Sequence, residues 1–169
     1  WEQISHQKAF RGKRDNGLLY VSVEAQAGYS KLFTDPVFLD SLERVKYPGI
    51  TYTGDEYRYF EVSGDSMEYY NEDNQPSGLF NGITVVAERV PPEHWEFTSQ
   101  YYIHVIVTEN QILIKRLFRK DDNKTFVLIS DNPEYPQIAK DITELRELWI
   151  VKRKIDWYMP PPRKIEIVV

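Results

Sequence analysis

Residues 101–130 read YYIHVIVTENQILIKRLFRKDDNKTFVLIS, and this stretch decides the fold. Three segments rich in β-branched and aromatic residues, at 101–107, 111–118 and 125–130, are separated by turn-forming residues at 109–110 and 121–123. Strands joined by such short turns pair with their neighbours along the chain. The stretch therefore predicts a three-stranded antiparallel meander.

Other strands are predicted on both sides of this meander, at 18–25, 56–62, 82–90 and 148–158. The first of them, LLYVSVEA, is expected to end in a turn at Gln26–Tyr29. Only DPVFLDSLERV, from Asp35, has an apolar spacing typical of a helix, and that helix should end near Pro48. We therefore expect a mainly β domain with one or two short helices.

The length of 169 residues fits one ordinary domain with an arm. Residues 1–17 combine a basic cluster at 8–14 with an Asp-Asn-Gly turn, which is typical of a linker or N-terminal arm. The folded domain is predicted to cover residues 18–169. Because the chain begins at Trp1, we expect it to be a piece of a longer protein.

Composition excludes several classes of function. The net charge of −5 argues against a large basic face for nucleic acid. The absence of cysteine excludes disulfides and thiolate metal sites, and His6, His94 and His104 lack a paired-ligand spacing, so neither a metal nor another cofactor is expected. The longest apolar run, Tyr101–Val107, is too short to cross a membrane as a helix.

Lys115 occupies an unusual place in the central strand of the predicted meander. Strand alternation puts its side chain on the same face as Leu113 and Leu117. An ammonium held among apolar side chains has its charged form disfavoured, so its pKa falls and the amine becomes a usable base near neutral pH. Alternatively, the stem packs against the core and the ammonium reaches solvent. The alternation alone leaves both interpretations open.

Ser66 lies on a sharp turn, SGDSM at 63–67, directly after a predicted strand. A serine after a glycine turn is commonly a helix cap. It can also be a nucleophile where a base lies beside it and backbone N–H groups face the developing oxyanion, and Ser–Lys pairs meet that requirement. Asp65 and Asp131 stand in turn sequences, where an aspartate usually bonds to its own backbone, so both are expected to be structural.

Four short motifs occur in order along the chain: AQAGY at 25–29, GDSM at 64–67, IKRL at 114–117 and SDNPEY at 130–135. Together they resemble the self-cleaving serine peptidase family of LexA, the phage repressors and UmuD, over roughly residues 18–157. The chain departs from this family at Tyr69, where a proline is usual, and in a longer interval between GDSM and IKRL.

The resemblance implies a fold of highly twisted, mostly antiparallel sheets, as in LexA and signal peptidase. It implies a Ser–Lys dyad in which Ser66 is the nucleophile, Lys115 is the general base and the backbone N–H of Ser66 binds the oxyanion. It also implies self-cleavage between Ala27 and Gly28.

For partners, the resemblance implies a homodimer and an upstream helix-turn-helix domain, absent from this chain, through which alone the regulator binds DNA. It further implies a RecA-type filament as the trigger and a cytoplasmic protein without membrane contact. The apolar tail KIEIVV, at 164–169, is expected to be covered by a strand edge of the same or a partner chain.

Two other functions fit the sequence. A non-catalytic dimerisation or ligand-sensing module could keep the peptidase fold. The position of Lys115 discriminates between this module and the self-cleaving peptidase, because a base must be shielded from water and within hydrogen-bond reach of Ser66. A signal-peptidase-like enzyme acting on other proteins is disfavoured, because the sequence has no membrane anchor.

Overall fold

The structure is a computed structural model that describes residues 17–156, 159 and 166–168. The basic cluster at 8–14 and almost all of the predicted arm lie outside the described residues. Of the tail at 164–169, only 166–168 are described, and they form no strand and are exposed.

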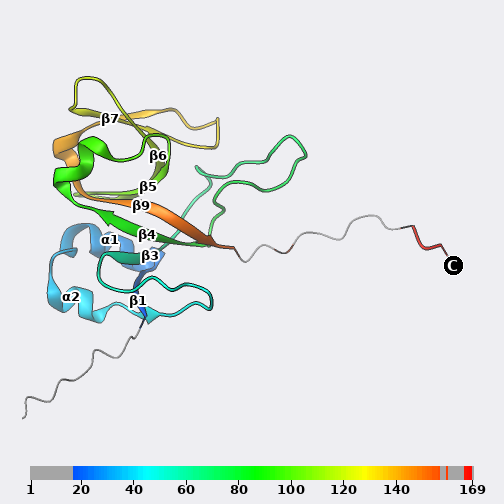
Figure 1. Cartoon of the computed structure of the whole chain (residues 1–169), viewed down its shortest axis with the longest axis horizontal. Helices are drawn as coiled ribbons and strands as arrows, with labels where there is room; N and C mark the ends of the chain where they lie inside the picture. Colours follow the sequence, from blue (N-terminus) through cyan, green and yellow to red (C-terminus); the bar gives the residue numbers. More distant parts are fainter. Residues whose placement is uncertain (1–16, 157–158, 160–165, 169) are drawn as a thin grey trace, which may run out of the picture.

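The described chain is mainly β, as predicted, with nine strands in one sheet. Along the sheet the strands follow the order β2-β1-β3-β4-β9-β5-β6-β7-β8, and among the described strands β1 and β3 form the single parallel pair. In Figure 1, β5, β6 and β7 lie on one side of β4 and β9, while β1, β3 and both α-helices lie on the other. The strand bounds are β1 Leu18–Val21, β2 Arg44–Val45, β3 Tyr57–Glu61, β4 Thr84–Val90, β5 Ile103–Thr108, β6 Ile112–Arg119, β7 Thr125–Ile129, β8 Ile138–Asp141 and β9 Leu145–Ile155.

The predicted meander is confirmed as β5, β6 and β7, which pair antiparallel in sequence order. The register places Lys115 opposite His104 on β5, and Leu117 opposite Leu128 on β7. The chain then adds β8, Ile138–Asp141, to the outer edge of β7. The sequence analysis did not predict this strand.

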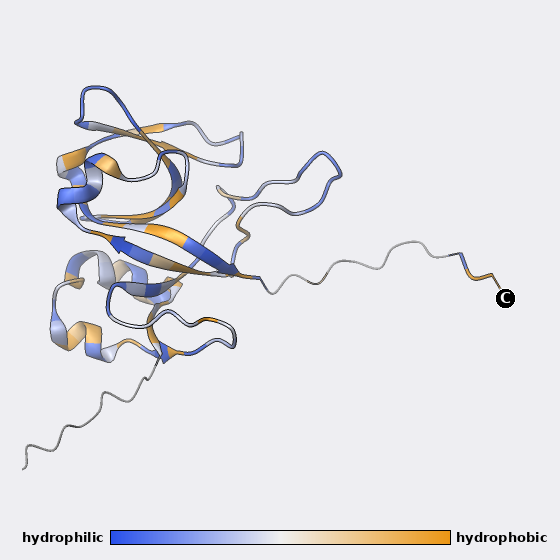
Figure 2. Ribbon diagram, viewed as in Figure 1, coloured by the Kyte–Doolittle hydropathy of each residue, from blue (hydrophilic) through white to orange (hydrophobic). Residues whose placement is uncertain are grey.

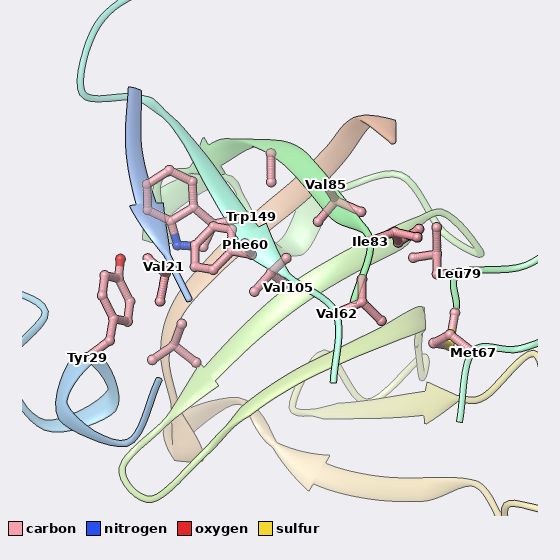
Figure 3. Close-up of a cluster of buried hydrophobic side chains, with 12 residues drawn as sticks. Val21, Tyr29, Phe60, Val62, Met67, Leu79, Ile83, Val85, Val105 and Trp149 are labelled. Carbon is pink, nitrogen blue, oxygen red and sulfur yellow. The ribbon is translucent and has the colours of Figure 1, made fainter. Parts of the chain in front are cut away.

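Two hydrophobic clusters occupy opposite faces of the central strands. The pair Val105 and Trp149 belongs to the first cluster, and the next pair along β5 and β9, Ile106 and Leu148, belongs to the second. This alternation follows from the period of two in a strand. Figure 3 shows the first cluster, with Phe60 beside Trp149.

The structure corrects the prediction for residues 18–29. The strand ends at Val21, and helix α1 follows at Val23–Leu32, so Gln26–Tyr29 is helical rather than a turn. Ser22 caps the helix by accepting a hydrogen bond from the backbone N–H of Ala25 at 3.3 Å. Alanine, glutamine, lysine and leucine in this segment all favour a helix, and Tyr29 is fully buried in the first cluster.

The predicted helix after Asp35 is present but shorter than expected. Helix α2 covers Pro36–Ser41, with Asp35 as its cap and proline at its first position. It ends well before Pro48 because Arg44 and Val45 form β2 and pair with the edge of β1.

The connections outside the sheet are polar or form single turns. The segment 69–82 projects from the body as a loop with a hydrophilic tip (Figure 2), as predicted. The segment 91–100 contains a 3-10 helix, η1, at Pro92–Phe97, and a second one, η2, spans Ile142–Glu144. No helix in the described part of the chain is long and apolar enough to cross a membrane.

Candidate active site

The turn that carries Ser66 leaves β3 in a defined backbone conformation. Gly64 has φ of +80°, a left-handed value that favours glycine, and its N–H donates to Asn81 Oδ1 at 2.9 Å. The backbone N–H of Glu68 donates to the carbonyl of Asp65 at 3.0 Å, which closes a turn around Ser66. Ser66 is therefore presented on a tight turn directly after a core strand.

Met67 anchors this turn in the first hydrophobic cluster. Its side chain is 1% exposed and lies beside Leu79 (Figure 3), and its carbonyl accepts the N–H of Leu79 at 2.8 Å. A Cβ at Gly78 would stand 2.2 Å from the Met67 carbonyl oxygen, so only glycine allows the returning segment to pack this closely. The core therefore holds the turn of Ser66 in place through Met67.

Lys115 reaches the same turn from β6. Its Nζ is in hydrogen-bond contact with Ser66 Oγ, although 49 residues separate the two along the chain. The lysine side chain is 6% exposed. The structure thus brings together the two residues that the sequence analysis predicted as a dyad, and it rules out a Lys115 ammonium held in open solvent.

The surroundings of Lys115 act on its pKa in opposite directions. Burial lowers the pKa below that of a free lysine, and the nearby carboxylate of Asp65 raises it. The lowering is the larger effect. A larger share of the amine is therefore neutral at a given pH than in an exposed lysine, as a general base requires.

The segment 130–135 holds the turn of Ser66 from the other side. The Asn132 backbone N–H donates to the Ser66 carbonyl at 3.1 Å, and its side-chain amide donates to the Asp65 carbonyl at 3.2 Å. The Tyr135 hydroxyl donates to the Asp65 carboxylate, and the Tyr135 ring lies 5.8 Å from Lys115 Nζ. Sequence reasoning had assigned no role to Asn132 or Tyr135.

Both aspartates that were expected to bond to their own backbone have distant side-chain partners instead. Asp65 accepts a hydrogen bond from the Tyr135 hydroxyl. Asp131 forms a bidentate ion pair with Arg116, whose Nη2 lies 2.9 Å from Asp131 Oδ2. A turn sequence indicates a bond to local backbone, but these carboxylates are within reach of donors from other segments.

The predicted scissile bond, Ala27–Gly28, does not lie in an extended segment. It is within helix α1, and its Ala27 carbonyl accepts a hydrogen bond from Ser30 Oγ at 3.1 Å. In Figure 3, the neighbouring Tyr29 and the dyad's neighbour Met67 stand at opposite ends of the core cluster. In this conformation the bond is not presented to Ser66.

A buried polar network fixes α1 to the sheet. The Tyr29 hydroxyl donates to Glu147 Oε2 on β9 at 2.6 Å and accepts from Arg58 on β3, and Trp149 Nε1 donates to the same carboxylate oxygen at 3.0 Å. Arg58, Glu147 and both rings are at most 7% exposed. Burial and the carboxylate raise the pKa of the Tyr29 hydroxyl, so it stays a donor. We call Arg58, Tyr29 and Glu147 the α1 latch.

The histidines stand outside the dyad chemistry. His94 is exposed, and His6 lies outside the described residues. His104 is fully buried with both ring nitrogens occupied, by Thr98 Oγ1 and the Tyr102 carbonyl, each at 2.8 Å. Because a carbonyl only accepts, Nδ1 carries the proton and Nε2 accepts from the threonine. Burial lowers the pKa of His104 to about 4, so it is neutral near pH 7.

A comparison with known protein families places most of this chain within a family model. The family model described as Peptidase S24-like matches residues 19–151. The matched range contains all four motifs from the sequence analysis, including both residues of the dyad. A search of curated proteins found no match.

Proposed function

The chain belongs to the Peptidase S24-like family, and from that premise we propose that it is a Ser–Lys peptidase that cleaves its own chain. The observation that carries the proposal is the contact of Lys115 Nζ with Ser66 Oγ, with the lysine shielded from water. An exposed lysine would stay protonated at neutral pH and could not accept the serine proton.

In the proposed reaction, neutral Lys115 takes the proton of Ser66 as Oγ attacks the carbonyl carbon of the scissile peptide. The backbone N–H of Ser66, which donates to no acceptor within the described residues, stabilises the developing oxyanion. The Lys115 ammonium then gives its proton to the leaving amine, which leaves an ester on Ser66. Water, deprotonated by Lys115, hydrolyses the ester and restores the hydroxyl.

We propose Ala27–Gly28 as the bond cleaved, and the position of this bond adds a condition. A helical peptide has its carbonyl occupied by hydrogen bonds and its flanks covered by neighbouring turns. Helix α1 must therefore unwind and the α1 latch must open before the Ala27 carbonyl can reach Ser66. Cleavage is then slowed by the free energy of that opening, about tenfold for each 1.4 kcal/mol.

Intact mass spectrometry tests this proposal on the chain of 169 residues. After incubation from neutral to alkaline pH, we expect fragments 1–27 and 28–169, formed faster as pH rises because only the neutral amine is a base. Ser66→Ala and Lys115→Met should abolish them. Ser63→Ala, an exposed serine on the same turn, is the matched control and should cleave normally.

Cutting that persists in Ser66→Ala, or cutting at another bond, would contradict this mechanism. The absence of cutting by the wild type at every pH would favour a second candidate, a non-catalytic dimerisation or sensing module. One observation supports that candidate: Ala27–Gly28 is folded into a helix with a buried anchor. The buried dyad favours the first, because a mere dimerisation module gains nothing from a desolvated lysine.

The proposal extends to the wider protein. As a self-cleaving domain, the chain would form the C-terminal regulatory part of a transcriptional repressor, pair with a second copy, and bind DNA only through an upstream helix-turn-helix domain. A RecA-type filament would then act by favouring the conformation in which α1 is unwound. These roles come from the family and from the position of the scissile bond.

A further inference from the structure

We propose that Asp65 and Tyr135 are positioning residues of the dyad. They hold the turn of Ser66 against Lys115 and set the pH at which the lysine amine can act as a base. The inference rests on the proposed peptidase function. It concerns two residues that the dyad chemistry itself does not use.

The first support is mechanical. Three hydrogen bonds cross from segment 130–135 to the turn of Ser66: two are donated by Asn132 to successive carbonyls, and one by the Tyr135 hydroxyl to the Asp65 carboxylate. They join parts of the chain that are about 70 residues apart. The bond from Tyr135 fixes the direction of the Asp65 side chain, which would otherwise rotate freely in solvent.

The second support is electrostatic, because the same pair surrounds the lysine. The carboxylate of Asp65 stabilises the Lys115 ammonium, and the face of the Tyr135 ring, 5.8 Å from Nζ, does so as well. The carboxylate opposes the effect of burial on the Lys115 pKa, and a ring face turned to an ammonium acts in the same direction. The tyrosine therefore acts twice: it contributes its ring and it holds the charge of its partner in place.

Within the part of the chain that the structure describes, the neighbours of Lys115 along the strands are neutral or paired with an opposite charge. On one side of β6, the cross-strand partner His104 is neutral near pH 7. On the other side, β7 reads TFVLI and has no ionisable side chain. Arg116 and Asp131 pair with each other. Among the described residues, Asp65 is the carboxylate that raises the Lys115 pKa, and it also acts most strongly on Tyr135, ahead of Glu134 and Glu68.

The balance matters because the lysine has two tasks. It must be neutral to accept the Ser66 proton and charged to protonate the leaving amine. With burial alone its pKa would fall further. Removing the carboxylate should therefore lower the Lys115 pKa, raise the share of neutral amine near pH 7 and move the alkaline rise of the cleavage rate to lower pH.

The test is a pH titration of Lys115 by NMR, in protein labelled with ¹³C at the lysine Cε and assigned with Lys115→Met. Asp65→Asn, which keeps the shape of the side chain, should lower the pKa. Tyr135→Leu should lower it too, and Tyr135→Phe, which keeps the ring, should lower it less. Glu134→Gln, on the same segment, is the matched control and should leave it unchanged.

Cleavage is then followed across pH in the same variants. The rate at pH 7 should rise in Asp65→Asn by tenfold for each unit by which the pKa falls, up to the limit at which the amine is fully neutral. A merely structural role would reduce the rate at every pH without moving the profile. An unchanged or raised Lys115 pKa in Asp65→Asn overturns the inference.

The two measurements separate this inference from the proposed function. If the wild type does not cleave, the peptidase proposal fails while the NMR titration still reports how Asp65 and Tyr135 act on Lys115. If a variant does not fold, raising the salt concentration of the wild type provides a second measurement. Salt screens the exposed Asp65 carboxylate and should lower the Lys115 pKa, and a Lys115 pKa that does not fall with added salt would contradict the inference.

Discussion

The α1 latch provides the sharpest test of how the scissile bond becomes available. Replacing Tyr29 by phenylalanine keeps the buried ring, which packs edge-on against Phe60, and removes the hydroxyl. Glu147 then loses a donor at 2.6 Å, and Arg58 loses an acceptor while its Nε already lacks a partner among the described residues. Glu147 and Arg58 remain buried in the folded domain, so the lost hydrogen bonds destabilise the state in which α1 is docked.

The size of the effect follows from those contacts. Hydrogen bonds to charged groups contribute about 1.5–3 kcal/mol each to stability, and an unpaired buried group costs a similar amount. Tyr29→Phe should therefore bring the unwound form of α1 closer to the docked form by roughly 1.5–3 kcal/mol. If cleavage proceeds from the unwound form, the rate should rise about 10- to 100-fold.

The assay is the time course of the fragments 1–27 and 28–169 at a fixed alkaline pH, with urea unfolding of the same samples. Leu128→Ala is the matched control: Leu128 is fully buried in the second cluster, away from α1, and its truncation should cost about 2–5 kcal/mol. We expect the control to lose stability without faster cleavage. If Tyr29→Phe lowers stability but leaves the rate unchanged, cleavage does not require α1 to unwind.

Four further predictions concern stability, DNA binding and the oligomeric state. Lys115→Met should raise the free energy of unfolding at pH 7 by roughly 1 kcal/mol. The wild type should become more stable at higher pH, because its folded state loses the lysine proton before its unfolded state does, and the variant should lack this gain. Urea unfolding at pH 7 and 10 measures both effects. Folding lowers the pKa of His104 from 6.5 to about 4, so the free energy of unfolding of the wild type should fall by roughly 3 kcal/mol as pH drops across that window. In urea unfolding over the same pH range, His104→Gln should lose less stability. Fluorescence anisotropy at moderate salt should detect only weak DNA binding, since the chain carries a net charge of −5, and tight sequence-dependent binding would contradict this. Light scattering should give twice the chain mass of 20.0 kDa, and a monomer at all concentrations, with or without residues 160–169, would contradict a dimer.

The sequence predicts those site residues that a nearby sequence pattern marks, and it misses those whose partners lie far away along the chain. Ser66 stands in a four-residue motif after a strand, and Lys115 interrupts an apolar strand face, so local patterns within ten residues made both candidates. The resemblance to a known family, and not the local patterns, joined them into a dyad. The partners of Asp65 are 67 and 70 residues away. No local pattern indicates them, because their contact depends on how two loops meet above the sheet.

The strands of the meander were predictable for the same reason, and helix α1 was not. Residues 18–25 are rich in β-branched and aromatic side chains, and Val21, Val23 and Ala25 alternate with Ser22 and Glu24 as they would in a strand. What makes it a helix after Ser22 is the cap together with the partners of Tyr29, which lie 29 and 118 residues further along the chain. The local patterns conflict here, because the alternation at 19–25 favours a strand while residues 25–32 favour a helix, and the tertiary contacts of Tyr29 decide between them.

The dyad and the α1 latch act on different factors of the same rate, and this independence is itself testable. Variants of Asp65 change the fraction of neutral Lys115, so they move the pH profile. Tyr29→Phe changes the population of unwound α1, and because the Tyr29 hydroxyl does not titrate in the working range, it should multiply the rate by one factor at every pH. Since Asp65 shares no contact with the α1 latch, and since Tyr29 and the Met67 beside the dyad lie at opposite ends of the core cluster (Figure 3), the two free-energy changes should add. The double variant Tyr29→Phe with Asp65→Asn should therefore cleave at a rate given by the product of the two single effects. A clear departure from that product would mean that docking of α1 changes the dyad itself. The unwinding of α1 and the protonation state of Lys115 would then be coupled.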